Sequence, residues 1–218
     1  MYLYEQIKDI KLGLHKSYPY IKNIKTEKTD LQPTTNVDRK VFIGDVRDEK
    51  RLNSAIKNID YVIHTAAMKH VSIAEYNPME CIKTNVLGAE NVINAAIEND
   101  VEKVVALSTD KAANPINLYG STKLTAEKMF ISSNLTSGGK KTKFSVIRYG
   151  NVSFSRGSVL VLYKELINKK FKQLPLTDPE MTRFCISLDK AVTFVDNCID
   201  KMKGNEIFIP KSKSYRVI

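Results

Sequence analysis

The stretch Val104–Lys123 reads VVALSTDKAANPINLYGSTK. It begins with a continuous apolar run, residues 104–107, which predicts a buried strand of a parallel sheet. The chain then turns at Pro115 and enters a segment of helical character. A second apolar run, residues 144–147, predicts another strand after that helix. A strand, a helix and a further strand in this order indicate an α/β sheet.

The rest of the chain continues this alternation. Strands are also predicted at 41–46 and 61–65, and helices at 49–57 and 78–99, with a Gly138-Gly139 turn before the strand at 144–147. In the longer helix the apolar residues recur with a period of about 3.6 residues; they are Val86, Ala89, Ile93, Ala96 and Ile97. We therefore predict an α/β fold with a doubly wound parallel sheet.

Four side chains that can move protons lie close together in the opening stretch. Tyr119 and Lys123 are four residues apart, so they share one face of a helix. Asp110 and Lys111 directly follow a strand, at the end where open α/β sheets bind ligands. A Tyr-x-x-x-Lys spacing by itself is common by chance, but this placement favours an enzyme.

Composition sets outer limits on function. The chain has 218 residues, 43% of them hydrophobic, and no apolar run approaches the about 18–20 residues of a membrane span. We expect a cytoplasmic protein, because the start lacks the pattern of a signal peptide and the cysteines, at Cys81, Cys185 and Cys198, show no C-x-x-C spacing. His64 and His70 are not at metal-ligand spacing, so we interpret both as structural and expect no metal.

The chain is strongly basic, with a net charge of +10 and a pI of 9.4. Its lysines are scattered, and it carries no nucleic-acid-binding motif, so we expect neither nucleic acid nor a membrane as a partner. A substrate that carries a diphosphate suits such a surface better.

Residues 108–123 resemble the active-site segment of extended short-chain dehydrogenase/reductases. More narrowly, they are similar to inverting UDP-N-acetylglucosamine 4,6-dehydratases. The other matching stretches are FIGDVRD at 42–48, IHTAAMKHV at 63–71, TNV at 84–86, RYGNV at 148–152, SRGSV at 155–159 and MTRF at 181–184. The resemblance extends from about residue 41 to about residue 210 and implies a Rossmann-like fold.

The resemblance implies a reaction in which C4 of the sugar is oxidised, water is lost across C5 and C6, and hydride returns to C6. Tyr119 would be the base at C4, with Lys123 supplying the charge that lowers the pKa of the phenol. Lys111 would remove the C5 proton, which requires a depressed lysine pKa. Asp110 would be the protonated acid at C6, oriented by Thr109.

The resemblance also implies binding roles. The expected cofactor is NADP, with NAD as the open alternative, and the expected substrate is UDP-N-acetylglucosamine. The cofactor residues are Asp45, Val46, Ala66, Ala67, Tyr119, Lys123 and Val152. The substrate residues are Lys69, Thr84, Asn151, Arg156, Gly157, Ser158 and Arg183. The resemblance further implies self-association into a homo-oligomer through helices that flank the sheet.

The chain differs from this family at its ends. A dinucleotide-binding fold begins with a glycine-rich turn at a helix N-terminus, whereas Gly13 is the one glycine before Gly44. We expect an atypical segment at 1–40, a Rossmann-like core at 41–150 that lacks the usual first βα unit, and a partial substrate-binding region at 151–218 that is an incomplete C-terminal lobe. Phe154 stands where the family has glycine, and its ring is expected to crowd the pocket.

Two other functions stay open. A UDP-sugar 4-epimerase would use Tyr119 and Lys123 without needing Asp110 and Lys111. An inactive fragment of the dehydratase would bind no dinucleotide and convert nothing.

Overall fold

The computed structural model describes residues 21–22, 42–155, 158–176 and 178–217. The main sheet has the order β1-β2-β3-β4-β7. Its strands are β1 (Ile21–Lys22), β2 (Tyr61–His64), β3 (Lys103–Thr109), β4 (Lys143–Tyr149) and β7 (Ile207–Phe208). β1 pairs antiparallel with β2, and all other pairs are parallel. The predicted α/β fold with a parallel sheet is confirmed.

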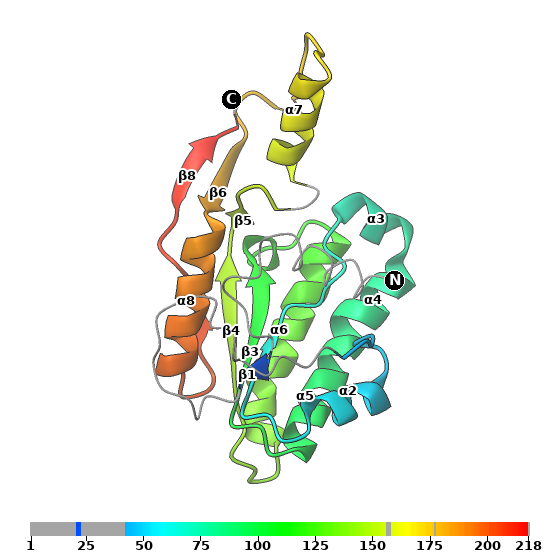
Figure 1. Ribbon diagram of the computed structural model, residues 1–218, viewed down its shortest axis with the longest axis vertical. Coiled ribbons are helices and arrows are strands. Elements are labelled where there is room, and N and C mark those ends of the chain that lie inside the picture. The colour runs from blue at the N-terminus through cyan, green and yellow to red at the C-terminus, as the bar shows by residue number, and fades with distance from the viewer. Residues whose placement is uncertain (1–20, 23–41, 156–157, 177, 218) are drawn as a thin grey trace, which may run out of the picture.

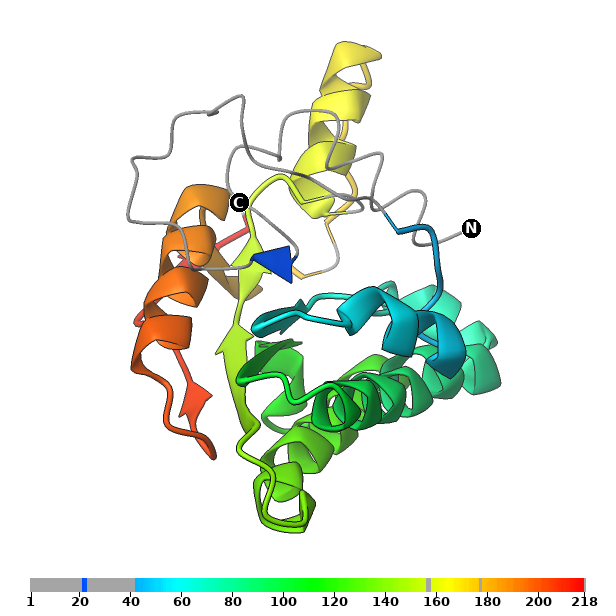
Figure 2. The ribbon, with the colours of Figure 1, turned by 60° about the horizontal axis from the view of Figure 1, so that its bottom comes forward.

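Helices cover both faces of this sheet (Figure 1). Val104 and Ala106 of β3 belong to a core cluster with residues of α2 (Glu49–Ile56), α5 (Gly88–Glu98) and α6 (Leu118–Thr136). Val105, on the opposite side of the strand, packs in a second cluster with Val195 of α8 (Leu188–Lys201). Because side chains alternate along a strand, one apolar run supplies both cores. Figure 2 shows α8 on one side of the sheet and α5 and α6 on the other.

The predicted helix at 78–99 is present, but it contains a local irregularity. Its parts are α4 (Pro78–Ile82), a π-helical turn η2 (Lys83–Leu87) and α5, and the short helix α3 (Val71–Tyr76) precedes them. A π-turn holds one more residue per turn than an α-helix and is common at functional sites. Here it contains the fully buried Asn85.

A second, three-stranded sheet has the order β5-β6-β8. It consists of β5 (Asn151–Val152), β6 (Thr182–Ile186) and β8 (Lys213–Arg216), with α7 (Val159–Asn168) between the first two. Gly150 alone separates β4 from β5. A Cβ on this glycine would come within 2.4 Å of the Phe184 carbonyl oxygen, so the strand crosses from one sheet to the other only without a side chain there.

The strand predicted at 41–46 is wrong for its described part, because residues 42–46 form no strand. Over the described residues, β2 pairs with β3 along its length and with β1 at Tyr61 and Val62, and residues 42–46 pair with neither edge. Other contacts hold this segment. Arg51 Nε donates to the Ile43 carbonyl at 2.7 Å, and Asn91 Nδ2 donates to the Val46 carbonyl at 3.0 Å.

The remaining predicted elements compare directly with the structure. The helix at 49–57 and the strands at 61–65, 104–107 and 144–147 are confirmed, and both residues of the Gly138-Gly139 turn have positive φ. Apart from Ile21–Lys22, the segment 1–40 lies outside the described residues.

Candidate active site

The N-terminus of α6 is fixed against the end of β3. Asn117 caps the helix by accepting the Gly120 N–H at 2.9 Å, and Glu75 accepts the Leu118 N–H at 2.6 Å. Gly120 lies against the short 3-10 turn η3 (Asp110–Ala112), because a Cβ there would come within 2.4 Å of the Lys111 carbonyl. This close approach brings the start of the helix to the four proton-handling side chains.

Tyr119 and Lys123 lie on the same face of α6, as predicted, but they make separate contacts. The Tyr119 hydroxyl is hydrogen-bonded to the Thr109 side chain, whereas Lys123 Nζ donates to the Leu107 carbonyl at 2.7 Å. Burial raises the pKa of Tyr119 to about 12, and Thr109 opposes this rise. The expected lowering of this phenol pKa by Lys123 is therefore absent. Burial lowers the pKa of Lys123 itself to about 8, while Glu127 raises it.

Asp110 and Lys111 form a hydrogen-bonded group with their neighbours. Lys111 Nζ lies 3.1 Å from Asp110 Oδ1 and 3.2 Å from Asn151 Oδ1. The Thr109 hydroxyl donates to the same Asp110 oxygen at 3.0 Å. One network therefore joins Thr109, Asp110 and Lys111 to the predicted substrate residue Asn151, and Tyr119 adjoins it through Thr109. Lys123 lies outside this network, because its ammonium bonds the Leu107 carbonyl.

Sequence reasoning missed a buried ion pair beside this network. Glu127, one turn after Lys123, is 2% exposed and accepts from both Arg148 on β4 and the Ser108 hydroxyl. The bond to Glu127 raises the pKa of Arg148. The four-residue spacing of Tyr119, Lys123 and Glu127 was the signal in the sequence, since it places all three on one helical face.

Asn85 is a second residue that sequence reasoning missed, although it lies in a matching stretch. Its amide oxygen accepts the Met68 N–H at 2.7 Å, and its amide nitrogen donates to the Met68 carbonyl and to Thr122 Oγ1, each at 3.0 Å. Thr122 in turn donates to the Tyr119 carbonyl at 2.9 Å. The π-turn thus connects the loop after β2 to the first turns of α6.

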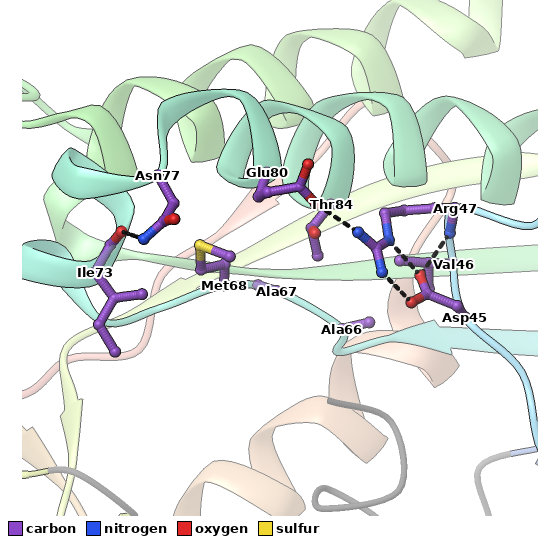
Figure 3. A pocket seen from close by; sticks show the side chains of 10 residues that line it. All are labelled: Asp45, Val46, Arg47, Ala66, Ala67, Met68, Ile73, Asn77, Glu80 and Thr84. Atoms are coloured by element: carbon purple, nitrogen blue, oxygen red, sulfur yellow. Dashed lines mark hydrogen bonds and ion pairs between the residues drawn. The ribbon is translucent and has the colours of Figure 1, made fainter. Parts of the chain in front are cut away.

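A cavity of about 310 Å³ lies between the loop after β2 and the helices α4 and η2 (Figure 3). It brings together the predicted cofactor residues Asp45, Val46, Ala66 and Ala67. It also contains Thr84, which the resemblance assigned to the substrate. Lys69, which the resemblance also assigned to the substrate, is exposed and directly follows the lining residue Met68.

A larger cavity of about 830 Å³ lies beside the second sheet. It contains the predicted substrate residues Asn151, Ser158 and Arg183, together with Val152, which the resemblance assigned to the cofactor. Ser158 Oγ is buried and has no hydrogen-bond partner among the described residues. The lining also contains four further cations, Lys190, Lys211, Lys213 and Arg216. Arg156 and Gly157 lie outside the described residues.

Phe154 does not crowd either cavity. Its side chain is 65% exposed, and it is absent from both linings. Its backbone, however, has φ of 57°, in the left-handed region that favours glycine.

The histidines described by the structure occupy structural positions. His64 is buried against the Phe130 ring, with 5.6 Å between ring centroids. Burial, followed by the charge of Lys123, lowers its pKa to about 3, so the ring is neutral. His70 precedes α3 at its N-cap. Over the described ranges, we find no cluster of three metal-ligating side chains and no helix with the length and apolar character of a membrane span.

A protein-family model described as "Polysaccharide biosynthesis protein" matches residues 3–218. The chain is 59% identical over 176 residues to UDP-N-acetylglucosamine 4,6-dehydratase (inverting) from Campylobacter jejuni, which covers 81% of this chain and 53% of that protein. It is 47% identical over 178 residues to UDP-glucose 4-epimerase from Rickettsia canadensis, which covers 82% and 52%. The chain thus spans about half the length of these curated relatives.

The fold is also found among solved structures. The structure of dTDP-glucose 4,6-dehydratase from Streptomyces venezuelae, determined with NAD bound, matches with a TM-score of 0.76 and 20% identity. The match covers 85% of this chain and 63% of the other. This similarity confirms the predicted Rossmann-like architecture.

Proposed function

Since the chain belongs to the polysaccharide biosynthesis protein family, we propose that it carries the catalytic residues of an inverting UDP-N-acetylglucosamine 4,6-dehydratase. The product is a 4-keto-6-deoxy UDP-sugar for a surface polysaccharide or a flagellin glycan. The observation that carries the proposal is the position of Lys111 Nζ, 3.1 Å from Asp110 and 3.2 Å from Asn151. An elimination needs a base and an acid besides the Tyr–Lys pair, and these residues supply both at one strand end.

Tyr119 takes the proton of the C4 hydroxyl in this proposal. Acceptance of hydride from C4 and its later return to C6 are the chemistry that a bound nicotinamide group would supply. Because burial raises the pKa of Tyr119 to about 12, a nearby positive charge is needed to form the phenolate near neutral pH. Lys123, one turn away, does not lower this pKa in the structure as it stands. Its charge would act on Tyr119 once the dinucleotide is bound, when the lysine would also hold the nicotinamide ribose.

Asp110 and Lys111 carry out the loss of water. The C4 ketone acidifies the C5 proton, which Lys111 removes, while Asp110 protonates the C6 hydroxyl as it leaves. The 3.1 Å hydrogen bond between Lys111 Nζ and Asp110 Oδ1 is the proposed route by which a proton passes from the amine to the carboxyl group before the elimination. One transfer creates the free base and the protonated acid together. Protonation of C5 from the opposite face then gives the inverted product.

The first cavity fits the adenosine end of a nicotinamide dinucleotide. Ala66 and Ala67 allow close approach, and the Asp45 carboxylate offers an acceptor for an exocyclic amine. We propose NADP as the cofactor from the resemblance, with NAD as the alternative. Val46 and Val152 complete the proposed cofactor set.

The second cavity fits the UDP group. Arginine donates two parallel hydrogen bonds to a phosphate, and Arg183 lies among lysines in the lining. The unpartnered Ser158 hydroxyl offers a further bond. We propose residues 151–218 as a partial substrate-binding region, to which Arg156 and Gly157 also belong, and residues 41–150 as the cofactor-binding core. Thr84 and Lys69 contribute from the core.

Product analysis tests this proposal. The purified chain is incubated with UDP-N-acetylglucosamine and NADP or NAD, and the products are identified by mass spectrometry and NMR. A 4-keto-6-deoxy sugar with inverted C5 is expected, and Lys111→Met should abolish it. Lys128→Met, on an exposed lysine of α6, is the matched control and should retain activity. Absence of any product from the folded chain contradicts the proposal.

The relative named UDP-glucose 4-epimerase, at 47% identity, supports a second candidate. An epimerase returns hydride to C4 and so gives a 4-epimer without loss of water. It would also tolerate Lys111→Met. The inactive-fragment alternative predicts neither product and no bound dinucleotide.

We also propose that the protein acts in the cytoplasm as a homo-oligomer. A nucleotide-sugar substrate supports this compartment, and light scattering on the purified chain tests self-association. A monomer at micromolar concentration would contradict the oligomer.

A further inference from the structure

Arg47 holds the carboxylate of Asp45 at the rim of the first cavity. Its backbone N–H and its Nε donate to Asp45 Oδ1 at 2.9 Å and 3.0 Å, and its Nη2 donates to Oδ2 at 2.8 Å. A carboxylate has about four acceptor positions in its plane, two on each oxygen. Arg47 therefore occupies three of them and leaves one, on Oδ2.

The same arginine connects the two walls of the cavity. Its Nη1 donates to Glu80 Oε2 at 2.7 Å, and Glu80 also accepts from Lys83 at 3.0 Å. Figure 3 shows Arg47 between Asp45 on one side and Glu80 on the helix that forms the opposite wall. These ion pairs are half-exposed, so each adds little stability. Their effect is to fix the direction in which the carboxylate points.

The segment below Asp45 is also held in place. Val46 packs on Gly88, where a Cβ would approach Val46 Cγ2 to 2.7 Å, and its carbonyl accepts from Asn91 at 3.0 Å. The inner lining is apolar at Ala66 and Ala67. Beside Asp45 the cavity thus presents the small apolar side chains of Ala66 and Ala67, and the Asp45 carboxylate keeps one acceptor position.

We propose that Arg47 determines base specificity in this cavity, by orienting Asp45 so that its remaining acceptor position receives the 6-amino group of adenine. This inference rests on the proposed function for the identity of the ligand. A purine with a carbonyl at position 6 places an acceptor against an acceptor, and the pocket therefore disfavours it. Arg47 acts through Asp45 and is a positioning residue.

ADP and IDP are suitable probes because they differ in the purine alone. Isothermal titration of the full chain should give at least about 10-fold tighter binding of ADP, since IDP would place its 6-carbonyl acceptor against the carboxylate acceptor and lose that hydrogen bond. Arg47→Met should weaken ADP binding and bring the two affinities within about 3-fold, because Asp45 is then free to rotate. Arg47→Lys, which lacks the planar fork, should not restore the preference.

Two further variants separate specificity from folding. Asp45→Ala removes the carboxylate acceptor, so it should abolish the preference for ADP. Arg51→Met, which removes an arginine that bonds Ile43 instead of Asp45, should keep the wild-type ratio. Circular dichroism checks that each variant is folded.

The outcomes are distinct from those of the product assay. A wild-type chain that binds neither nucleotide, or binds both equally, overturns the inference. An unchanged ADP preference in Arg47→Met also overturns it. Product formation with no change of preference leaves the dehydratase proposal standing without this role for Arg47. A chain that prefers ADP in an Arg47-dependent way but forms no product would support this role of Arg47 and contradict the dehydratase proposal.

Discussion

The ammonium of Lys123 donates a hydrogen bond to the backbone carbonyl of Leu107, 2.7 Å away. The lysine is therefore anchored to the middle strand of the sheet, one turn from Tyr119. Its side chain is buried, and burial lowers its pKa to about 8. The proposed function requires the charged form of Lys123, which its buried position in the folded protein disfavours.

This cost leads to a prediction with a defined pH dependence. The charged form of Lys123 is destabilised by folding, so the cost is fully present below pH 8 and is relieved as the pH rises toward the ordinary lysine pKa of 10.5. Lys123→Met should be more stable than wild type near pH 7, and this advantage should shrink by about 2 kcal/mol between pH 7 and pH 9.5. Urea unfolding at both pH values measures it. A stability difference between Lys123→Met and wild type that does not change with pH would contradict the lowered pKa of Lys123. The same pH trend in Lys128→Met would also contradict it.

The buried pair of Glu127 and Arg148 should matter more than any surface pair. Glu127→Gln leaves the arginine without its charged partner and should lower the free energy of unfolding by about 3 kcal/mol. The matched control is Glu180→Gln, whose partner Arg216 is exposed and whose loss should cost less than about 1 kcal/mol. Urea unfolding of both variants is the measurement. Equal losses of unfolding free energy in the two variants would show that the buried pair stabilises the fold no more than the exposed pair.

Gly120 should respond to alanine in the direction opposite to that of an ordinary helix position. Alanine normally favours a helix over glycine by about 1 kcal/mol. At this site its Cβ would come within 2.4 Å of the Lys111 carbonyl, so Gly120→Ala should destabilise the protein and separate Tyr119 from the Asp110–Lys111 group. Thermal unfolding and the product assay should both show a loss, whereas Ser121→Ala on the exposed side of the helix should be nearly neutral.

Phe154 and Gly138 form a matched test of backbone strain. Both have positive φ, 57° and 63°, and a Cβ added at Gly138 would meet no atom within 4 Å. Phe154→Gly should stabilise the protein by about 1 kcal/mol and Gly138→Ala should destabilise it by a similar amount. The two melting temperatures should move in opposite directions. A lower melting temperature for Phe154→Gly would indicate that the exposed ring makes a stabilising contact.

The sequence predicts best where local pattern determines structure. The apolar run at Val104–Leu107 specifies a strand buried on both faces, and two core clusters pack against it. The spacing of Tyr119 and Lys123 correctly places them on one helical face. At residues 42–46 the same kind of pattern fails, because an apolar run does not determine whether a partner strand lies beside it. This segment is held instead by hydrogen bonds from the side chains of Arg51 and Asn91.

The electrostatics of the site are less predictable from sequence. The hydrogen bond from Lys123 to Leu107 depends on how α6 docks on β3, and no spacing rule encodes that contact. Docking also determines that Glu127 meets Arg148 from a different strand. Asn85 acquires its role only through the π-turn, which adds one residue to the helix and directs the amide inward.

The single-residue link at Gly150 limits where the polypeptide can be divided. Because β4 and β5 belong to different sheets and are joined without a loop, a cut there would remove the covalent link that aligns the two sheets and would leave β7 of the main sheet in the C-terminal fragment. The Gly138-Gly139 turn is exposed and makes no close contact, so it is the better position for fragment complementation or for insertion of a reporter tag.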